Sequence, residues 1–347
     1  MLHKPFGGNP SKQQRHAYEK LENYQNGKFV NLAAIDSSMR FSDILSMIKK
    51  SIFSGNEERR PAQAPPLADI DWDRIASERD SLTWFGHSAF LLSMDNKKIL
   101  IDPMLGNRAS PVSFAGGTRY NKNMLDIIQD LPPLDAVFLT HDHYDHLDFA
   151  SISRLKNKVG HFLVPLGVSA HLIRWGIERE KITELNWWDE IDFKGLTVAL
   201  TPSHHFSGRG AFNGNSTLWG GWVILGKSTR FYISGDGGYG DHFKQIGEKY
   251  GPFDISLLEG GQYDDLWKWA HMTPEESVQA HLDVKGKTML LTHWGAFTLA
   301  FHSWKDPIER AVLAAEQLGV HLTAPKIGET LLLNDIQPQS PVAWWNR

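Results

Sequence analysis

"DAVFLTHDHYDHLD", residues 135–148, is an apolar run that leads into a turn rich in histidine and aspartate. Its last ten residues hold three histidines and three aspartates. His141 and His143 lie two positions apart where the strand-like run ends, so their side chains can share one face. A divalent cation with nitrogen and oxygen ligands needs about four donors, and this turn supplies more than one ion can use. The stretch therefore predicts two adjacent metal ions.

Three further apolar runs also end in residues that can bind a metal. They lead into Ser203-His204-His205, into Asp236 and into His293. The alternative is that all these residues are ordinary polar side chains at the surface or at helix caps. The probability that the histidine-rich turn and three more such strand ends occur together by chance is small, so we favour one shared metal centre.

Strand-like runs alternate with helical stretches from residue 82 onward. The segment "MTPEESVQAHLD" opens with a capping-box spacing from Thr273 to Glu276 and has Pro274 at its first helical position. The segment "DPIERAVLAAEQLG" has helical periodicity and stops at Gly319. This density of mixed elements predicts layered sheets covered by helices.

The composition excludes some other kinds of site and disfavours others. The chain has 347 residues, of which 41% are hydrophobic, so it can bury a sizeable core. The absence of cysteine excludes disulfides, thiolate ligands and cysteine nucleophiles. A formal net charge of −4 supplies no basic face for nucleic acid. No apolar signal core opens the sequence, and no run approaches the roughly 18 apolar residues of a membrane span, so we expect a cytoplasmic protein.

Residues 1–80 are polar and irregular, and we expect them to form an N-terminal extension before the main domain at 81–347. The stretch 54–69 is rich in proline, glycine and charge, which indicates a surface linker. The stretch "FSDILSMIKKSIF", residues 41–53, has apolar residues at helical spacing. Such a helix either packs on the domain or contacts the inner face of a membrane. We favour packing, because most amphipathic helices of soluble proteins face a core.

Longer motifs follow one another in a fixed order between Thr83 and Ala300. They include "TWFGHSAFLL", "IDPMLGNRASP", "LPPLDAVFLTHDHYDHLD", "TPSHHFSGR", "HMTPEESVQAH" and "HWGAFTLA". With its His-x-His-x-Asp-His turn, the chain resembles the metallo-β-lactamase superfamily, and within it the N-acylphosphatidylethanolamine-hydrolysing phospholipase D family. The resemblance implies an α/β fold of four layers, the αβ/βα sandwich, in which two mixed sheets flanked by helices hold metals at one edge.

The resemblance also implies the metal ligands. His205 is expected rather than His204, because the family places a ligand at the end of a TPSxH motif. Relatives with a cysteine ligand are excluded by composition, and di-iron redox relatives usually carry glutamate where His143 stands. Zinc is the expected metal, although iron and manganese accept the same ligands. The expected ligands are His141, His143 and His205 for one ion and Asp145, His146 and His293 for the other, with Asp236 bridging both.

Asp102 and His87 lie outside the ligand set and match family motifs. A metal-bound histidine usually donates its other N–H to a carboxylate or a carbonyl, and Asp102 in "ILIDP" resembles the family position that accepts this bond. A turn carboxylate before Pro103 is the alternative. His87 in "FGHSAF" is not a ligand in the family, and we expect it to be packed and hydrogen-bonded.

Four residues are candidates for contact with a substrate. His271 matches a histidine near the family's active site, where it could orient a phosphate or protonate a leaving group. A structural role at the entry of the following helix is the alternative. Arg209 could clamp an anion through its planar guanidinium or lie in an exposed loop. Trp219 and Trp267 could line an apolar groove or belong to the core.

The resemblance implies a hydrolase that attacks a phosphodiester of phospholipid-like substrates with a metal-bridging hydroxide, and Asp145 and His271 are its expected catalytic side chains. A lactone or cyclic-ester hydrolase is the alternative. A metal-binding protein without activity is disfavoured, since a structural zinc site is closed with four ligands. The stretch 259–271 is shorter than in the family and lacks its proline-arginine pair, which leaves the substrate open. We expect a small-molecule or phospholipid substrate and no nucleic acid, and leave open a peripheral membrane contact and a homodimer.

Overall fold

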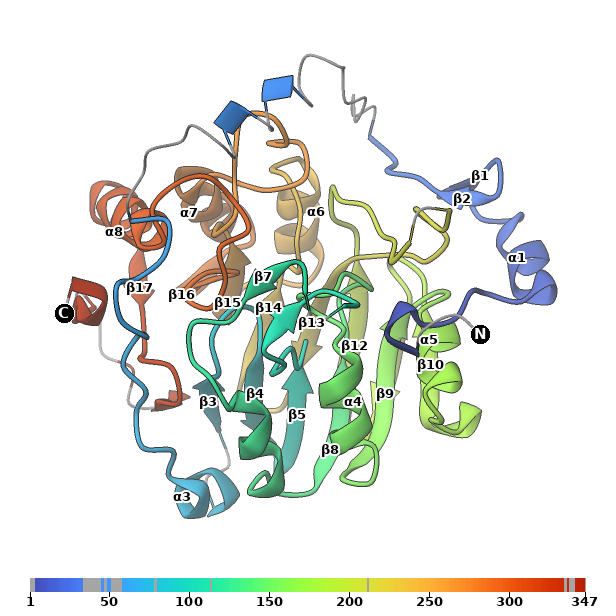
Figure 1. Cartoon of the computed structure of the whole chain (residues 1–347), viewed down its shortest axis with the longest axis horizontal. Coiled ribbons are helices and arrows are strands. Elements are labelled where there is room, and N and C mark those ends of the chain that lie inside the picture. Colours follow the sequence, from blue (N-terminus) through green and yellow to red (C-terminus); the bar gives the residue numbers. More distant parts are fainter. Residues whose placement is uncertain are drawn as a thin grey trace.

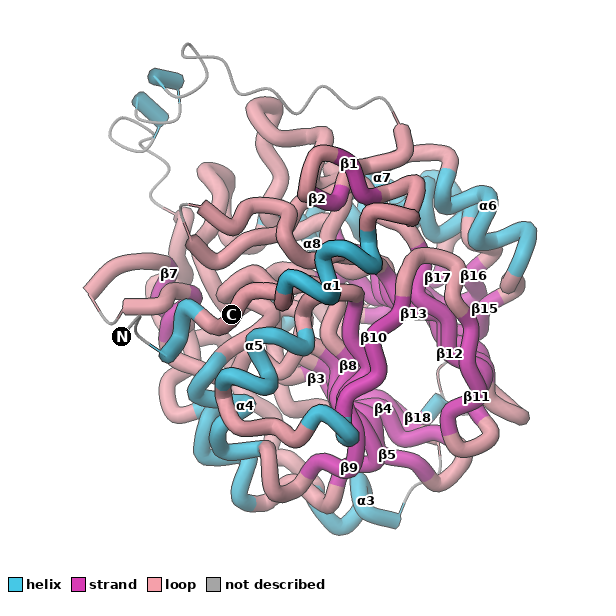
Figure 2. Tube along the Cα trace, turned by 90° about the vertical axis from the view of Figure 1, so that its right-hand side faces the viewer, coloured by secondary structure: helices cyan, strands magenta, loops and turns pink. Residues whose placement is uncertain are grey.

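Two seven-stranded sheets lie face to face in the computed structural model, and helices cover their outer sides (Figure 1). The structure describes residues 4–33, 45–46, 49–50, 58–77, 80–112, 114–210, 212–333, 336 and 341–346. Figure 2, turned by a right angle, shows the two sheets as separate layers. The four-layer α/β sandwich expected from the sequence is therefore confirmed.

The first sheet has the strand order β10-β9-β8-β5-β4-β3-β18. Neighbours from β10 to β5 run parallel, and those from β5 to β18 run antiparallel. The strands are β3 (Ser81–Trp84), β4 (Phe90–Met94), β5 (Lys97–Ile101), β8 (Leu134–Phe138), β9 (Val159–Pro165), β10 (Ile182–Leu185) and β18 (Thr330–Leu332). The histidine-rich turn thus leaves from the carboxyl end of a central strand, β8.

The second sheet has the order β11-β12-β13-β14-β15-β16-β17 and is also mixed. Neighbours from β11 to β14 run antiparallel, and those from β14 to β17 run parallel. The strands are β11 (Glu190–Phe193), β12 (Leu196–Thr201), β13 (Gly221–Leu225), β14 (Arg230–Ile233), β15 (Phe253–Glu259), β16 (Gly286–Thr292) and β17 (His321–Thr323). The other expected ligands follow β12, β14 and β16.

The helices lie on the outer faces of both sheets. Helices α6, α7 and α8 pack together over β15, β16 and β17, while α4 and α5 lie beside the first sheet (Figure 2). Their bounds are α4 (Phe149–Leu155), α5 (Ser169–Arg174), α6 (His242–Lys249), α7 (Pro274–Asp283) and α8 (Asp306–Leu318). The predicted capping box joins Thr273 to Glu276, and Gly319 ends α8 at a φ of 68°.

Shorter elements connect these layers. Among the described residues the shorter helices include α1 (Lys12–Tyr18), α3 (Trp72–Ser77) and the 3-10 helices η1 (Lys4–Phe6), η2 (Met124–Gln129), η3 (Arg179–Lys181) and η5 (Trp344–Asn346). Two short hairpins are β1 (Tyr24–Gln25) with β2 (Lys28–Phe29) and β6 (Arg108–Ala109) with β7 (Gly117–Thr118). Tyr18, Tyr24 and Phe29 are buried in the same core cluster as the sheets. The division of the chain at residue 80 stays a prediction.

The helix predicted at 41–53 lies outside the described residues, apart from residues 45–46 and 49–50. Whether this helix packs on the domain, as we expect, or contacts a lipid surface is therefore not tested, and its packing stays a prediction. Within the part of the chain that the structure describes, no helix has the length and apolar character needed to cross a membrane.

The core between the sheets supports the histidine-rich turn from below. The ring of Phe138, on β8, lies 5.1 Å from that of Trp222 on β13. The indole N–H of Trp222 donates to the carbonyl of Leu139 at 3.0 Å. All three side chains are fully buried. This contact joins the two sheets directly beneath the first residues of the turn.

Candidate metal centre

The turn after β8 is tight and anchored at both ends. The backbone N–H groups of His146 and Leu147 both donate to the carbonyl of His143. Asp148 then caps α4, since its Oδ2 accepts from the N–H of Ser151 at 2.9 Å. The chain therefore folds back on itself between the strand and the helix.

Three histidines from two strand ends form one group of ligands. Nδ1 of His143 lies 2.9 Å from Nε2 of His141 and 3.3 Å from Nε2 of His205. His205 also contacts the carbonyl of Ala270 through Nδ1 at 3.0 Å. That contact aims its other ring nitrogen at the group.

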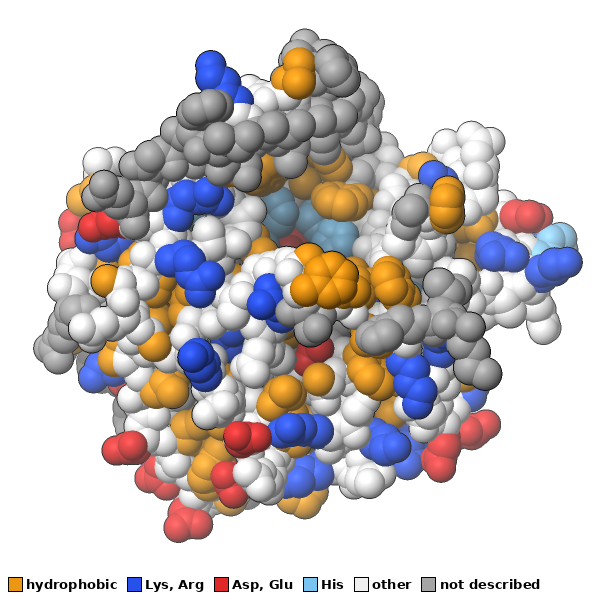
Figure 3. Space-filling view, in the orientation of Figure 1, with side chains coloured by type: hydrophobic (Ala, Val, Ile, Leu, Met, Phe, Trp, Pro, Cys, Tyr) orange, Lys and Arg blue, Asp and Glu red, His pale blue; other side chains and the backbone are white. Residues whose placement is uncertain are grey.

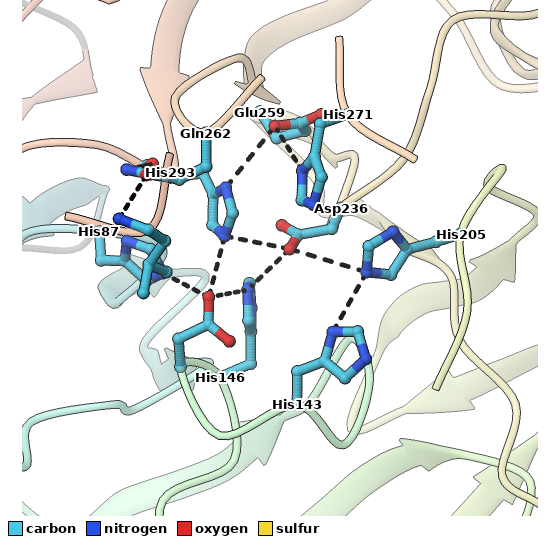
Figure 4. Close-up of polar contacts among 12 residues, drawn as sticks. His87, His143, His146, His205, Asp236, Glu259, Gln262, His271 and His293 are labelled. Atoms are coloured by element: carbon cyan, nitrogen blue, oxygen red, sulfur yellow. Dashed lines mark hydrogen bonds and ion pairs between the residues drawn. The ribbon is translucent and has the colours of Figure 1, made fainter. Parts of the chain in front are cut away.

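A second group lies beside the first. Oδ2 of Asp145 is 3.0 Å from Nε2 of His293 and 3.6 Å from Nε2 of His146. Asp236 stands between the groups, as Figure 4 shows: its Oδ2 is 3.1 Å from Nε2 of both His146 and His293. The same oxygen lies 3.8 Å from His141 and 3.9 Å from His205. The structure thus brings all seven expected ligands together.

The donor set suits divalent ions. Neighbouring nitrogen ligands on a tetrahedral zinc ion lie about 3.3 Å apart when the bonds are about 2.0 Å long, close to the separations around His143. Oδ1 of Asp236 is buried and has no hydrogen-bond partner among the described residues. Because a buried polar atom needs a partner, a cation bound here would satisfy an atom that the protein leaves unpaired.

The electrostatics divide the histidines into two kinds. Burial and the neighbouring His146 hold the pKa of His141 well below the usual range. Burial and the neighbouring His143 do the same to the pKa of His205. Neutral rings keep a lone pair free for a metal. Burial also opposes charge on His293, but the carboxylates of Asp236 and Asp145 raise its pKa to about 10.

His146 behaves like His293, because Asp236 and Asp145 outweigh burial and hold its pKa well above the usual value. Burial alone would raise the pKa of both carboxyl groups, yet the neighbouring histidines hold them well below their usual range. The metal-free cluster therefore carries protons on two rings, and cation binding must displace them.

Two residues hold the ligands from behind. Asp102 accepts hydrogen bonds from the N–H and hydroxyl of Thr140, at 2.8 and 2.6 Å, and lies 2.8 Å from Nδ1 of His146. Nε2 of the fully buried His87 lies 3.0 Å from Oδ2 of Asp145. Burial, with the nearby His293, lowers the pKa of His87 to about 3, so a neutral ring donates to Asp145. The sequence indicated that His87 is hydrogen-bonded, but it did not identify Asp145 as the partner.

His271 lies next to the cluster but is separate from the seven expected ligands. Its ring stacks on that of His293, with centroids 5.1 Å apart and planes 6° apart. Nδ1 of His271 is 3.5 Å from Oε2 of Glu259. Sequence reasoning missed Glu259, although it ends an apolar strand-like run, as the other strand-end ligands do.

Arg209 does not act as the expected anion clamp. It is buried, and its guanidinium donates to the carbonyls of Pro5, Asp142 and Leu147 at 2.6 to 3.3 Å. Because its donors point at these carbonyls, Arg209 fastens the N-terminal segment to the histidine-rich turn. The expectation of substrate binding by Arg209 does not agree with these contacts.

The tryptophans also need a correction. Trp219 has no exposed surface, and its indole N–H donates to the carbonyl of Ser203 at 3.0 Å, so it belongs to the core rather than to a groove. Trp267 is half-buried and donates to the carbonyl of Gln262 at 2.8 Å. Its role with substrate stays a prediction.

Phe206 is an aromatic residue at the centre that the sequence analysis did not single out. It is 38% exposed, and its ring lies 4.6 Å from that of His143 and 5.5 Å from that of Trp269. Figure 3 shows histidine side chains at the bottom of a hollow with apolar side chains around it. The ring of His204, in contrast, lies 4.5 Å from that of His242 at a tilt of 53°, and His204 is outside the ligand groups.

Comparisons with known proteins agree with this arrangement. A model of the β-lactamase superfamily domain matches residues 97–294, more than half of the chain. An uncharacterized protein of Mycobacterium tuberculosis is 40% identical over 334 residues, which are 94% of this chain and 88% of that protein. N-acyl-phosphatidylethanolamine-hydrolyzing phospholipase D 1 of Caenorhabditis elegans is 35% identical over 270 residues, which are 73% of this chain and 76% of that enzyme.

A solved structure shares the fold. Igni18, a metallo hydrolase of the archaeon Ignicoccus hospitalis, matches with a TM-score of 0.54 at 25% identity. The match covers 72% of this chain and 97% of that one. The fold, the histidine and aspartate cluster and the two kinds of relatives agree. The chain belongs to the metallo-β-lactamase superfamily and is a metal-dependent hydrolase.

Proposed function

We propose that this hydrolase cleaves a phosphodiester bond in phospholipid-like substrates and uses two divalent ions, with zinc as the expected metal. The observation that carries the proposal is the position of Asp236, whose Oδ2 lies within 3.9 Å of ligand nitrogens from both groups. The 35% identity to a phospholipase D that hydrolyses N-acyl-phosphatidylethanolamine supports the phosphodiester class.

Each residue of the cluster has a definite part in the proposal. His141, His143 and His205 would hold one ion, Asp145, His146 and His293 would hold the other, and Asp236 would contribute to both sites. Bound there, the two ions would lower the pKa of water to about 7 and stabilise charge on the phosphoryl oxygens. Asp145, whose side chain is 14% exposed, is also placed to orient the attacking water by accepting a hydrogen bond.

His271 completes the reaction as a proton donor. The attacking water gives up one proton to bulk solvent, its oxygen bonds to phosphorus, and the bond from phosphorus to the leaving oxygen breaks. An alkoxide is a poor leaving group, so a proton from the His271 ring to that oxygen lowers the barrier. The side chain of His271 is 14% exposed, which leaves it within reach of a substrate in the hollow.

The hollow supports a substrate with an apolar part. Phe206 lies against His143 and His205, with ring centroids 4.6 and 4.7 Å apart, and Trp269 lies beside Phe206. Aromatic side chains of this kind bind apolar groups next to a few polar ones. An acyl chain or a similar apolar group would fit beside the phosphodiester.

The test is turnover by the metal-loaded enzyme and by the chelated enzyme. We expect hydrolysis of bis-(p-nitrophenyl) phosphate and of an N-acylated phospholipid, lost with chelator and restored by zinc. His143→Ala should abolish both activities, while the control His16→Ala, at a histidine whose side chain is 81% exposed, should not. Hydrolysis of lactones but of neither phosphodiester would overturn the proposal in favour of a cyclic-ester hydrolase.

A further inference from the structure

Glu259 is a buried acid next to the metal centre that has no part in the ligand set. It is the last residue of β15 and has no exposed surface. Its Oε1 accepts a hydrogen bond from the N–H of Met272 at 2.6 Å. Its Oε2 is buried and has no hydrogen-bond partner among the described residues. Half of this carboxylate is therefore free for another partner.

The atoms that face Oε2 are ring nitrogens of two histidines. Oε2 lies 3.5 Å from Nδ1 of His271 and 3.7 Å from Nδ1 of His293. Both nitrogens are buried and also lack a hydrogen-bond partner in the described chain. Figure 4 shows the two rings side by side, with one carboxylate reaching both. Three buried polar atoms thus meet, and none of them has a hydrogen bond to any other residue that the structure describes.

The opposite edges of the two rings face the metal ligands. Nε2 of His293 lies 3.0 Å from Asp145 and 3.1 Å from Asp236. The ring of His271 lies 5.1 Å from that of His205. One carboxylate therefore stands behind both an expected metal ligand and the side chain placed to act on the leaving group.

The chemistry of imidazole gives this contact a consequence. A buried carboxylate is costly unless hydrogen-bond donors surround it, and the nearest available donors are the two Nδ1–H groups. A neutral imidazole with its proton on Nδ1 presents a lone pair at Nε2. Carboxylates behind metal-bound histidines act in this way and raise the basicity of the ligand.

We propose that Glu259 is a shared positioning residue, which accepts a hydrogen bond from Nδ1–H of both His293 and His271. It thereby turns the lone pair at Nε2 of His293 toward the metal. In His271 it points Nε2 at the leaving group, so that a ring protonated on both nitrogens gives up its Nε2 proton and remains as the neutral Nδ1–H form. The part that concerns His271 rests on the proposed function, whereas the part that concerns His293 needs only a metal.

The test compares Glu259→Gln with Glu184→Gln. Glutamine keeps the acceptor for Met272 but turns an N–H₂ group toward two N–H groups. Glu184 is a matched control, since its side chain is 7% exposed and accepts from the N–H groups of Gly167 and Ser169, away from the cluster. In chelator competition, Glu259→Gln should bind zinc about 10–100-fold more weakly, and Glu184→Gln should bind it like the wild type.

The kinetic arm separates positioning from a merely structural role. Glu259→Gln should lower kcat more for a phosphodiester with an alkoxide leaving group than for a p-nitrophenyl ester, with KM unchanged. In a His271→Ala background this leaving-group difference should vanish. Wild-type zinc affinity and equal kcat losses on both esters would overturn the proposal. If the wild type cleaves no phosphodiester, the proposed function fails, but zinc affinity still tests Glu259.

A measurement on the wild type covers the case in which Glu259→Gln does not fold. In protein labelled with ¹⁵N-histidine, we expect Nδ1–H protons of His271 and His293 that exchange slowly with solvent. His271→Ala should remove one of the two signals, which assigns it. A His271 ring without a proton on Nδ1 would overturn the proposal.

Discussion

Oδ2 of Asp236 lies 3.1 Å from Nε2 of His293, although the two residues leave different strands, β14 and β16. The same oxygen approaches His146 at 3.1 Å and His141 at 3.8 Å. A single carboxylate therefore touches both ligand groups, and its removal should not affect one ion alone.

Asp236→Ala should weaken both metal sites. We expect the purified wild type to hold about two divalent ions per chain, since a site of this type takes about four donors per ion. The variant should retain less of both, because it loses the shared donor. Metal analysis after dialysis measures this, with the surface variant His16→Ala as control. Two tightly held ions in Asp236→Ala would contradict the bridging role.

Metal affinity should rise with pH. The metal-free protein holds a proton on His293, whose pKa is raised to about 10 from 6.5. Binding must displace this proton, so below pH 10 the apparent affinity should rise about tenfold per pH unit for each proton released. Calorimetry in buffers of different ionisation enthalpy counts the protons. An affinity that does not change between pH 7 and 9 would contradict the prediction.

The same proton should affect the stability of the metal-free protein. Because the pKa of His293 is raised on folding, its contribution is full below about pH 6.5 and is lost as the pH rises toward 10. Denaturant unfolding of chelated wild type and of His293→Gln at several pH values isolates this contribution. The difference between the two proteins should shrink as the pH increases, and a difference that grows would oppose this assignment.

His271→Ala should keep both metals and lose the help given to poor leaving groups. We expect kcat to fall by about 10²–10⁴-fold for an alkoxide leaving group and much less for p-nitrophenolate, which needs no proton. Metal content is measured on the same samples. Equal losses on both substrates would show that His271 positions the phosphate or supports its loop.

Arg209→Met tests the structural role that the contacts of Arg209 indicate. The change leaves three carbonyls without their donor, and each unsatisfied buried group costs about 1–3 kcal/mol. The free energy of unfolding should therefore fall by roughly 3 kcal/mol or more, whereas KM of the folded fraction stays unchanged. The control is Arg154→Met, at an arginine whose side chain is 51% exposed. A large rise in KM without loss of stability would restore the anion clamp.

The sequence by itself determined the layered fold and which residues gather at its edge. The pattern of short apolar runs, the capping box before α7 and the glycine after α8 are local signals, because they depend on neighbours a few residues away. Strand-end residues such as His205, Asp236 and His293 meet because the strands that precede them end at a common edge. Local spacing therefore indicated which strand ends supply metal-binding residues, and the family resemblance implied which of those residues are ligands, for example His205 rather than His204.

Only the tertiary structure decided what Arg209, His87 and Glu259 do. Arg209 meets a carbonyl 204 residues away, and His87 meets Asp145 across 58 residues. Glu259 meets two histidines only because its strand and the following loop fold over the centre. Arginine and glutamate are usually exposed, so the residue type alone predicts that these side chains lie at the surface. The partner of a buried polar group depends on packing between distant segments, and the spacing of residues along the chain does not contain that information.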